Sequence, residues 1–296
     1  MCIRDRSTDW RLVYTSASPF GPNVLEQDLE DLPIRAKQLA LYPKTSGRHK
    51  TVVKYGQWEN AVASYLASVS FVDELIGDFI KALELHGIMK NTWVVLWSDH
   101  GWQLGEKEHW GKFTTWDRST KVPLITVPPR AKQPSGFEPG RRCNQPVSLL
   151  DVYPTVMDSL DLKIRYDIDG NSLVPLIANP ESLWPHSAST HVGRVTQTIR
   201  HARWRFTQYF DGSQELYDHK QDPREWNNLV QDPEHAIISH WLSNKLPADP
   251  NYKHFLRYRD YKAVVPSDGS PMMPVSYTHL RAHETRGNLV CRLLLE

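Results

Sequence analysis

Trp93-Val94-Val95-Leu96-Trp97-Ser98-Asp99-His100-Gly101 is an apolar run that ends abruptly in a polar tetrapeptide. A near-continuous apolar run of this length predicts a strand that is buried on both faces, as in a parallel sheet. A second run, Val122 to Val127, predicts a neighbouring strand. Ligands bind at the carboxyl ends of strands in open α/β sheets, so the first strand should deliver Asp99 to a binding edge.

Helical patterns lie on both sides of these two strands. Apolar residues recur at three- and four-residue steps from about Gln57 to His86, and Gly87 fits a helix stop. A further helix is predicted from Val147 to Leu160, whereas residues 8–58 are expected to be loop with little regular structure. Helix, strand, loop, strand and helix together predict an α/β layered fold.

The character of the sequence changes after about residue 164. Short strands are predicted at Arg194 to Arg200, Trp204 to Phe210 and Glu215 to Asp218, and Asp211-Gly212 supplies a hairpin turn. We therefore expect an α/β part over residues 7–165 and a smaller antiparallel α+β subdomain over residues 166–274.

Both ends of the sequence look foreign to the protein. Residues 1–6 back-translate to one end of a transposon-based sequencing adaptor, and residues 275–296 fit the reverse complement of that adaptor. We interpret both segments as adaptor translation, exclude them from fold reasoning, and expect the gene to continue upstream.

Composition excludes few classes of function. Without the two end segments, Lys+Arg falls from 35 to 30 and Asp+Glu from 34 to 31, so the net charge moves from +1 to −1. This near-neutral balance, together with apolar runs too short to cross a bilayer, gives no reason to expect a nucleic-acid or membrane partner. Cys143 is the cysteine left outside the ends, so no disulfide framework is expected.

The loop between the two strands concentrates ionisable side chains. The Asp99 carboxylate is a hard ligand suited to Ca²⁺ or Mg²⁺, and His100 is a second candidate ligand, although imidazole is softer than calcium usually selects. Lys112 can place a cation beside an anion held by the metal, and His109 is a candidate proton donor near neutral pH. These residues alone leave two alternatives open, a turn or helix cap at Asp99 and a solvated charged loop.

The ordered motifs of the chain resemble the sulfatase family of the alkaline-phosphatase superfamily, and most closely its iduronate-2-sulfatase and choline-sulfatase-like branch. The resemblance covers nearly all of residues 25–232 and rests on these segments: Ser98 to Glu106, His109 to Lys112, Lys121 to Leu124, Asp31 to Pro33, Tyr65 to Asp73, Val147 to Thr155, and Glu215 to His219 with the Asp222-Pro223 and Glu225-Trp226 pairs.

Several expectations follow from the resemblance. It implies the C-terminal half of an alkaline-phosphatase-like mixed sheet with flanking helices, and an activity that hydrolyses sulfate monoesters of saccharides or small organic molecules. It implies that Asp99 and His100 bind one Ca²⁺ and that Lys112 contacts sulfate. It favours a periplasmic or secreted location and leaves the oligomeric state open. Candidates for substrate contact are Trp102, His109, Arg118, His191 and Arg194.

The chain departs from the family pattern at the nucleophile. The family uses a formylglycine made from Cys or Ser within C/S-x-P-x-R, and Pro146 falls one place too late after Cys143 to complete that motif. The chain is therefore expected to be inactive alone, and to expose a sheet edge and a core face. Two alternatives remain: a metal-dependent phosphodiesterase or phosphomutase of the same superfamily, and a non-catalytic binding protein.

Overall fold

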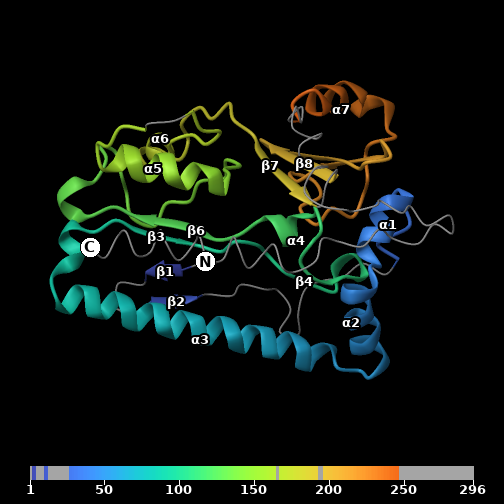
Figure 1. Cartoon of the computed structure of the whole chain (residues 1–296), viewed down its shortest axis with the longest axis horizontal. Coiled ribbons are helices and arrows are strands. Elements are labelled where there is room, and N and C mark those ends of the chain that lie inside the picture. The colour runs from blue at the N-terminus through green and yellow to red at the C-terminus, as the bar shows by residue number, and fades with distance from the viewer. Residues whose placement is uncertain (1, 5–9, 13–26, 165–166, 193–195, 247–296) are drawn as a thin grey trace, which may run out of the picture.

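A long helix forms one side of the molecule, and the sheet of β3 (Val94–Trp97) and β6 (Leu124–Val127) lies between it and a second group of helices (Figure 1). The computed structural model describes residues 2–4, 10–12, 27–164, 167–192 and 196–246. Helix α3 (Trp58–Leu85) spans the length of this side, as predicted, and leads into the 3₁₀ helix η1 (Ile88–Asn91). Gly87 joins the two at φ +71°, a left-handed conformation that glycine adopts without steric cost.

The two predicted strands exist, but their pairing corrects the expectation of a parallel, fully buried sheet. Strand β3 (Val94–Trp97) pairs antiparallel with β6 (Leu124–Val127), so that Val94 lies opposite Val127. A parallel neighbour needs a crossover that carries the chain back to the starting end of the sheet. Residues 98–123 instead fold out and return at the same end, and Trp97 is 46% exposed.

Residues 8–58 are more regular than expected. They contain α1 (Ile34–Ala40) and α2 (Pro43–Lys54), and the short strand β2 (Trp10–Leu12), which pairs antiparallel with β1 (Cys2–Arg4). The buried positions of α1 are two alanines, and a seven-residue helix with small buried side chains gives only a weak periodic signal. The prediction of loop over this region was therefore wrong.

One face of α3 is apolar and exposed. Phe71 and Phe79 are each 62% exposed, and Val72 and Leu75 on the same helix are about half exposed. Large exposed apolar patches mark interaction surfaces or aggregation liabilities. That a missing part of the protein covers this face stays a prediction.

The segment between β3 and β6 is an irregular loop pinned at several points. It contains strand β4 (Gln103–Leu104), the 3₁₀ helix η2 (Glu106–Glu108), strand β5 (Trp110–Gly111) and helix α4 (Asp117–Thr120). β4 pairs antiparallel with β5, and the buried Leu104 and Trp110 pack against Val62 of α3. The loop is therefore anchored on α3 and held near the end of β3.

A second helical layer covers the other side of β3 and β6 (Figure 1). It follows η3 (Arg130–Lys132) and contains η4 (Leu149–Asp151), α5 (Val152–Ser159) and α6 (Val174–Ala178). Ser148 and Asp151 form a reciprocal capping box at the start of η4, and η4 and α5 together occupy the helix predicted from Val147 to Leu160.

The C-terminal part is a four-stranded antiparallel sheet in the order β10-β9-β8-β7. The predicted strands appear as β8 (Thr196–His201), β9 (Trp204–Gln208) and β10 (Gln214–Asp218), with the predicted hairpin turn at Asp211-Gly212. The prediction missed the edge strand β7 (Ala188–Val192) and the elements η5 (Pro233–His235) and α7 (Ala236–Ser243).

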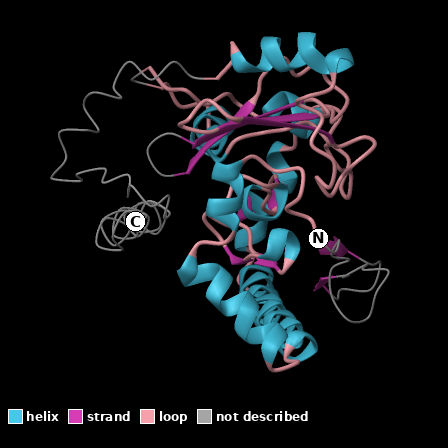
Figure 2. Cartoon of the chain, turned by 90° about the vertical axis from the view of Figure 1, so that its right-hand side faces the viewer, coloured by secondary structure: helices cyan, strands magenta, loops and turns pink. Residues whose placement is uncertain are grey.

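The two faces of this sheet carry different side chains. Phe206 and Leu216 pack beneath Leu242 of α7, which lies over one face in both views (Figures 1 and 2). The opposite face presents buried polar residues, since Arg205 lies across from Tyr217 in the register of β9 and β10. These polar residues face the loop that follows Lys112.

One core cluster crosses the boundary that we placed at residue 165. It joins α1 and its preceding turn, Trp116 of the loop, and Tyr209 and Tyr217 of the sheet. The N-terminal helix thus packs on the C-terminal sheet and the loop between them, and the division into residues 7–165 and 166–274 stays a prediction.

Candidate active site

Asp99, His100 and Lys112 lie together at the end of β3. The sharp turn after His100 depends on Gly101, because a Cβ at that position would lie 2.0 Å from the carbonyl oxygen of Arg118. The Gly101 amide also donates to the carbonyl of Ser119, which closes the loop on itself. The Asp99 side chain is 82% exposed, so its carboxylate is free to take a ligand from the groove side.

His100 is the centre of this cluster. Its Nε2 lies 2.7 Å from Lys112 Nζ and 3.6 Å from Asp99 Oδ1, and its Nδ1 lies 2.8 Å from the carbonyl oxygen of Gly101. A neutral imidazole that donates from Nδ1 to this carbonyl leaves Nε2 to accept from the Lys112 ammonium. The imidazole lone pair is thus occupied by the ammonium, and the Asp99 carboxylate and the Lys112 ammonium lie beside a common space.

This space opens into a groove of about 2790 Å³. Trp102 and Arg118 line the groove beside the cluster, and the exposed His191 of β7 lines it from the C-terminal sheet. Arg118 also forms an ion pair with Glu106 at 3.2 Å. The predicted substrate candidate Arg194 lies outside the described residues, so its position is untested.

His109 does not face the groove. The ring is 1% exposed, with Nδ1 2.8 Å from the carbonyl of Ala40 and Nε2 2.9 Å from the carbonyl of Lys112. A ring held between two carbonyls offers no free nitrogen to a substrate, and it ties the backbone of Lys112 to α1. The proton-donor role that we expected for His109 stays a prediction. The geometry favours a role in positioning the loop.

Burial lowers the pKa of His109 below its usual 6.5, even though both carbonyl contacts favour the charged ring. Below about pH 6.5 the unfolded chain therefore binds a proton that the folded chain refuses, so this residue's contribution to stability is present above that pH and is lost as the pH falls. We expect the free energy of unfolding of wild type to fall more steeply between about pH 7 and 5 than that of His109→Gln.

Urea denaturation at each pH measures this slope. Asp28, which titrates in the same range, is common to both proteins and cancels in the comparison. Parallel curves for the two proteins would show that His109 does not titrate as a buried neutral ring.

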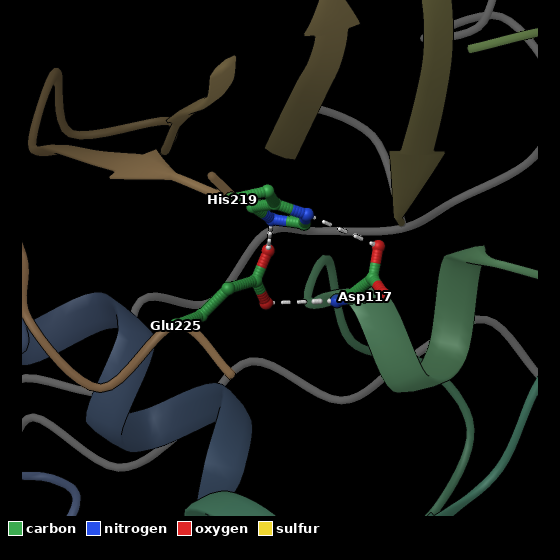
Figure 3. Close-up of side chains that lie close together, drawn as sticks. All are labelled: Asp117, His219 and Glu225. Atoms are coloured by element: carbon green, nitrogen blue, oxygen red, sulfur yellow. Dashed lines mark hydrogen bonds and ion pairs between the residues drawn. The ribbon is translucent and has the colours of Figure 1, made fainter. Parts of the chain in front are cut away.

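A second cluster of ionisable groups, Asp117, His219 and Glu225, lies behind the loop (Figure 3). His219 Nε2 lies 2.7 Å from Glu225 Oε1, and the Asp117 amide donates to Glu225 Oε2 at 2.8 Å. In this cluster, the side-chain oxygen and nitrogen atoms that can bind a metal ion lie within 4.8 Å of one another. The guanidinium of Arg205 already bridges its two carboxylates, at 2.9 Å from Asp117 and 2.6 Å from Glu225.

This cluster already has its compensating charge. Burial is the largest influence on Asp117 and Glu225 and opposes their ionisation, but Arg205 and His219, joined at Asp117 by Lys121, together hold both pKa values below their usual range. The sequence analysis did not identify these residues, because Asp117, Arg205 and Glu225 lie about 90 and 20 positions apart and form no local motif.

A buried ion pair, also not predicted, supports the same loop. Lys107 is 1% exposed, and its Nζ lies 2.6 Å from Asp28 Oδ1 and 2.5 Å from the carbonyl of Glu225. Burial raises the pKa of Asp28 to about 6, against the pull of the Lys107 ammonium. The backbone of Lys107 is left-handed at φ +53°, so three distant segments meet at one strained residue.

The comparisons with known proteins agree with this geometry. The sulfatase family model matches residues 19–162, and the model for the C-terminal part of N-sulphoglucosamine sulphohydrolase matches residues 105–251. The chain belongs to the sulfatase family. The resemblance predicted from the motifs around Asp99 and Lys112 is therefore confirmed at the level of the family.

Two relatives illustrate the similarity to this sulfatase-family chain. A sulfatase of Formosa agariphila is 33% identical over 222 residues, which cover 74% of this chain and 42% of the relative. A choline-sulfatase of Rhizobium meliloti is 28% identical over 244 residues, which cover 74% of this chain and 46% of the relative. The chain thus spans less than half the length of either relative.

Solved structures share the fold. A protein in complex with its substrate D-glucosamine-2-N,6-O-disulfate superposes with a TM-score of 0.54 at 29% identity, over 64% of this chain and 40% of that one. A phosphonate monoester hydrolase of Agrobacterium radiobacter gives 0.57 at 26%, over 64% and 41%. A 2-O GAG sulfatase gives 0.59 at 22%, over 81% and 58%, and this likeness supports the mixed α/β fold alone.

Among the described helices of this sulfatase-family chain, none combines the length and apolarity that a bilayer crossing requires.

Proposed function

We propose that the protein containing this chain hydrolyses sulfate monoesters of a saccharide or a small organic molecule. The observation that carries the proposal is the convergence of Asp99, His100 and Lys112 on one groove in a chain of the sulfatase family. A choline-sulfatase among the relatives and a structural neighbour with a bound glucosamine disulfate support this substrate class.

Lys112 and His100 have different roles in the proposed reaction. Lys112 Nζ is a fixed ammonium group at the groove, where it can donate to a sulfate oxygen as negative charge develops on it. His100 accepts from that ammonium and so fixes the direction in which it points. The Trp102 ring lies beside the pair, with its centroid 6.4 Å from that of the His100 ring.

A calcium ion fits the donor set only in part. Asp99 offers an exposed carboxylate and His100 an imidazole nitrogen, whereas Ca²⁺ takes 6–8 oxygen ligands. Asp99 would therefore hold one side of the ion, His100 Nε2 would join it only by releasing the Lys112 ammonium, and further carboxylates must complete the site. Bound there, calcium would supply positive charge beside the sulfate oxygens.

The formylglycine nucleophile belongs to the same proposal. We infer that it lies in a part of the protein that these 296 residues do not contain, since the chain carries no C/S-x-P-x-R motif. Recovery of the upstream gene tests this inference directly. A full-length protein without the motif would support the alternative of a non-catalytic binding protein.

Phosphonate or phosphate ester hydrolysis is the second candidate reaction, and one observation favours it. The phosphonate monoester hydrolase superposes on this chain with a TM-score of 0.57, against 0.54 for the protein with bound glucosamine disulfate. Both reactions place a tetrahedral anion against a metal and a cationic side chain, so the reaction type must be decided by measurement.

A substrate and metal panel on the full-length protein decides between the two reactions. We expect turnover of an aryl sulfate to exceed that of the matching aryl phosphonate, to be lost on chelation, and to return with calcium but not with zinc. Asp99→Asn should raise the calcium concentration for half-maximal activity by about tenfold or more. Zinc-dependent turnover of the phosphonate would instead favour the second reaction.

The location of the protein in the cell is inferred from the resemblance to the sulfatase family. We propose a periplasmic or secreted enzyme, and cell fractionation of the native host tests this.

A further inference from the structure

The segment that carries Lys112 has no regular structure of its own to fix its shape. It runs from the end of β5 at Gly111 to the start of α4 at Asp117. Phe113 adopts φ +74°, a left-handed conformation that non-glycine residues rarely take. Such a conformation persists only where surrounding contacts impose it, so the position of Lys112 depends on what holds this segment.

Arg205 of β9 reaches the main chain of this segment from the C-terminal sheet. Its Nη1 donates to the carbonyl of Thr115 at 3.0 Å, and its Nη2 donates to Asp117 Oδ1 at 2.9 Å. Its Nε lies 2.6 Å from Glu225 Oε1, and the Glu225 Oε2 atom in turn accepts from the Asp117 amide. One guanidinium thus binds the backbone and a side chain of the segment, three and five residues after Lys112.

Burial makes these contacts strong. Arg205 is 3% exposed and Glu225 is 1% exposed, so water does not compete for the donors and acceptors. The rigid, planar fork of arginine fits several acceptors at once, which the single ammonium of lysine cannot reproduce. A lysine at position 205 would keep the positive charge but not the simultaneous contacts to Thr115, Asp117 and Glu225.

Neighbouring contacts hold the rest of the segment. Trp116 Nε1 donates to Glu215 Oε2 at 2.9 Å, and Thr114 Oγ1 donates to Gln103 Oε1 at 2.5 Å. These bonds fix two side chains of the segment, whereas Arg205 binds its main chain. Side chains of the C-terminal sheet therefore determine the conformation of this segment.

We propose that Arg205 is a positioning residue for Lys112, and that the C-terminal sheet sets the geometry of the anion site through it. The proposal rests on the proposed function, in which Lys112 binds the tetrahedral anion. Arg205 itself acts behind the loop and contacts no substrate.

A double-mutant cycle in the full-length protein tests this. Arg205→Lys should lower kcat/KM by ~10- to 100-fold through kcat, because a small misplacement of a catalytic group has effects of this size. In a Lys112→Ala background the same substitution should change kcat/KM by less than about twofold, since the group being positioned is gone. Equal effects in both backgrounds would overturn the proposal, because a general loss of folding acts independently of Lys112.

The matched control is Arg203→Lys. Arg203 lies two residues earlier, pairs with Asp218 at 3.3 Å, and is 44% exposed in its side chain. The Arg203→Lys substitution should leave kcat/KM unchanged. Asp117→Asn provides a second variant should Arg205→Lys not fold, and it should show the same dependence on Lys112.

A readout that needs no turnover separates this proposal from the proposed function. Acylation of lysines, followed by mass spectrometry of the full-length protein, gives the rate at Lys112 relative to the exposed Lys54. We expect Arg205→Lys, but not Arg203→Lys, to move the Lys112 rate toward that of Lys54. An unchanged acylation rate at Lys112 in Arg205→Lys would overturn the positioning role. If the wild-type protein does not hydrolyse sulfate esters but the acylation rate changes as expected, only the proposed function is overturned.

Discussion

Replacing Lys112 by alanine in the full-length protein should lower turnover of a sulfate ester by ~10²–10³-fold, the size of effect seen when one preorganised donor to a developing anion is removed. Lys112 Nζ lies 2.7 Å from His100 Nε2, and Lys112 lines the same groove as Asp99, so the substitution removes a positive charge from beside the proposed metal ligands. Steady-state kinetics with an aryl sulfate measure the change, and kcat should fall more than KM rises.

Lys121→Ala is the matched control for that experiment. Lys121 lies in the same loop and lines the same groove, but its side chain is 76% exposed. We expect less than about a twofold change, because exposed ion pairs contribute little. A loss below tenfold for Lys112→Ala, or an equal loss for Lys121→Ala, would remove Lys112 from the anion site.

The largest expected effect on stability comes from Lys107→Met. The substitution leaves the Asp28 carboxylate buried without its partner, and it also removes donors from the carbonyls of Asp28 and Glu225. Breaking a buried pair from one side costs ~3–5 kcal/mol, which is a large share of the stability of a typical domain. Urea denaturation of the chain, monitored by tryptophan fluorescence, measures the loss.

Two further variants separate the ion pair from general effects of the substitution. Lys54→Met replaces an exposed lysine of α2 and should change the free energy of unfolding by less than about 0.5 kcal/mol. Asp28→Leu combined with Lys107→Met should recover part of the loss, because an apolar pair needs no compensating charge. A loss below about 1 kcal/mol in Lys107→Met would mean that Asp28 is neutral in the folded chain.

The parts of the fold that the sequence predicted are those with strong local signals. The three- and four-residue spacing of α3, the apolar runs of β3 and β6, and the turn at Gly212 each reflect the contacts of neighbouring residues. Strand direction was not readable, because an apolar run indicates burial but does not show which way the chain returns. Helix α1 was missed because its buried side chains are small.

The candidate site divides in the same way. Asp99, His100 and Lys112 lie within one loop, and their motif predicted a shared cluster that the structure brings together. Arg205 and Glu225 come from distant segments, and their role depends on packing that no local pattern records. His109 shows the limit of residue type as a guide, since a histidine beside the site is buried between two carbonyls.

The most direct test is a crystal structure of the full-length protein with calcium and sulfate. We predict that calcium binds the Asp99 carboxylate and His100, and that a sulfate oxygen lies within hydrogen-bonding distance of Lys112 Nζ. Calcium bound instead at Asp117, His219 and Glu225, or a sulfate held away from Lys112, would contradict the assignment of the anion site to the end of β3.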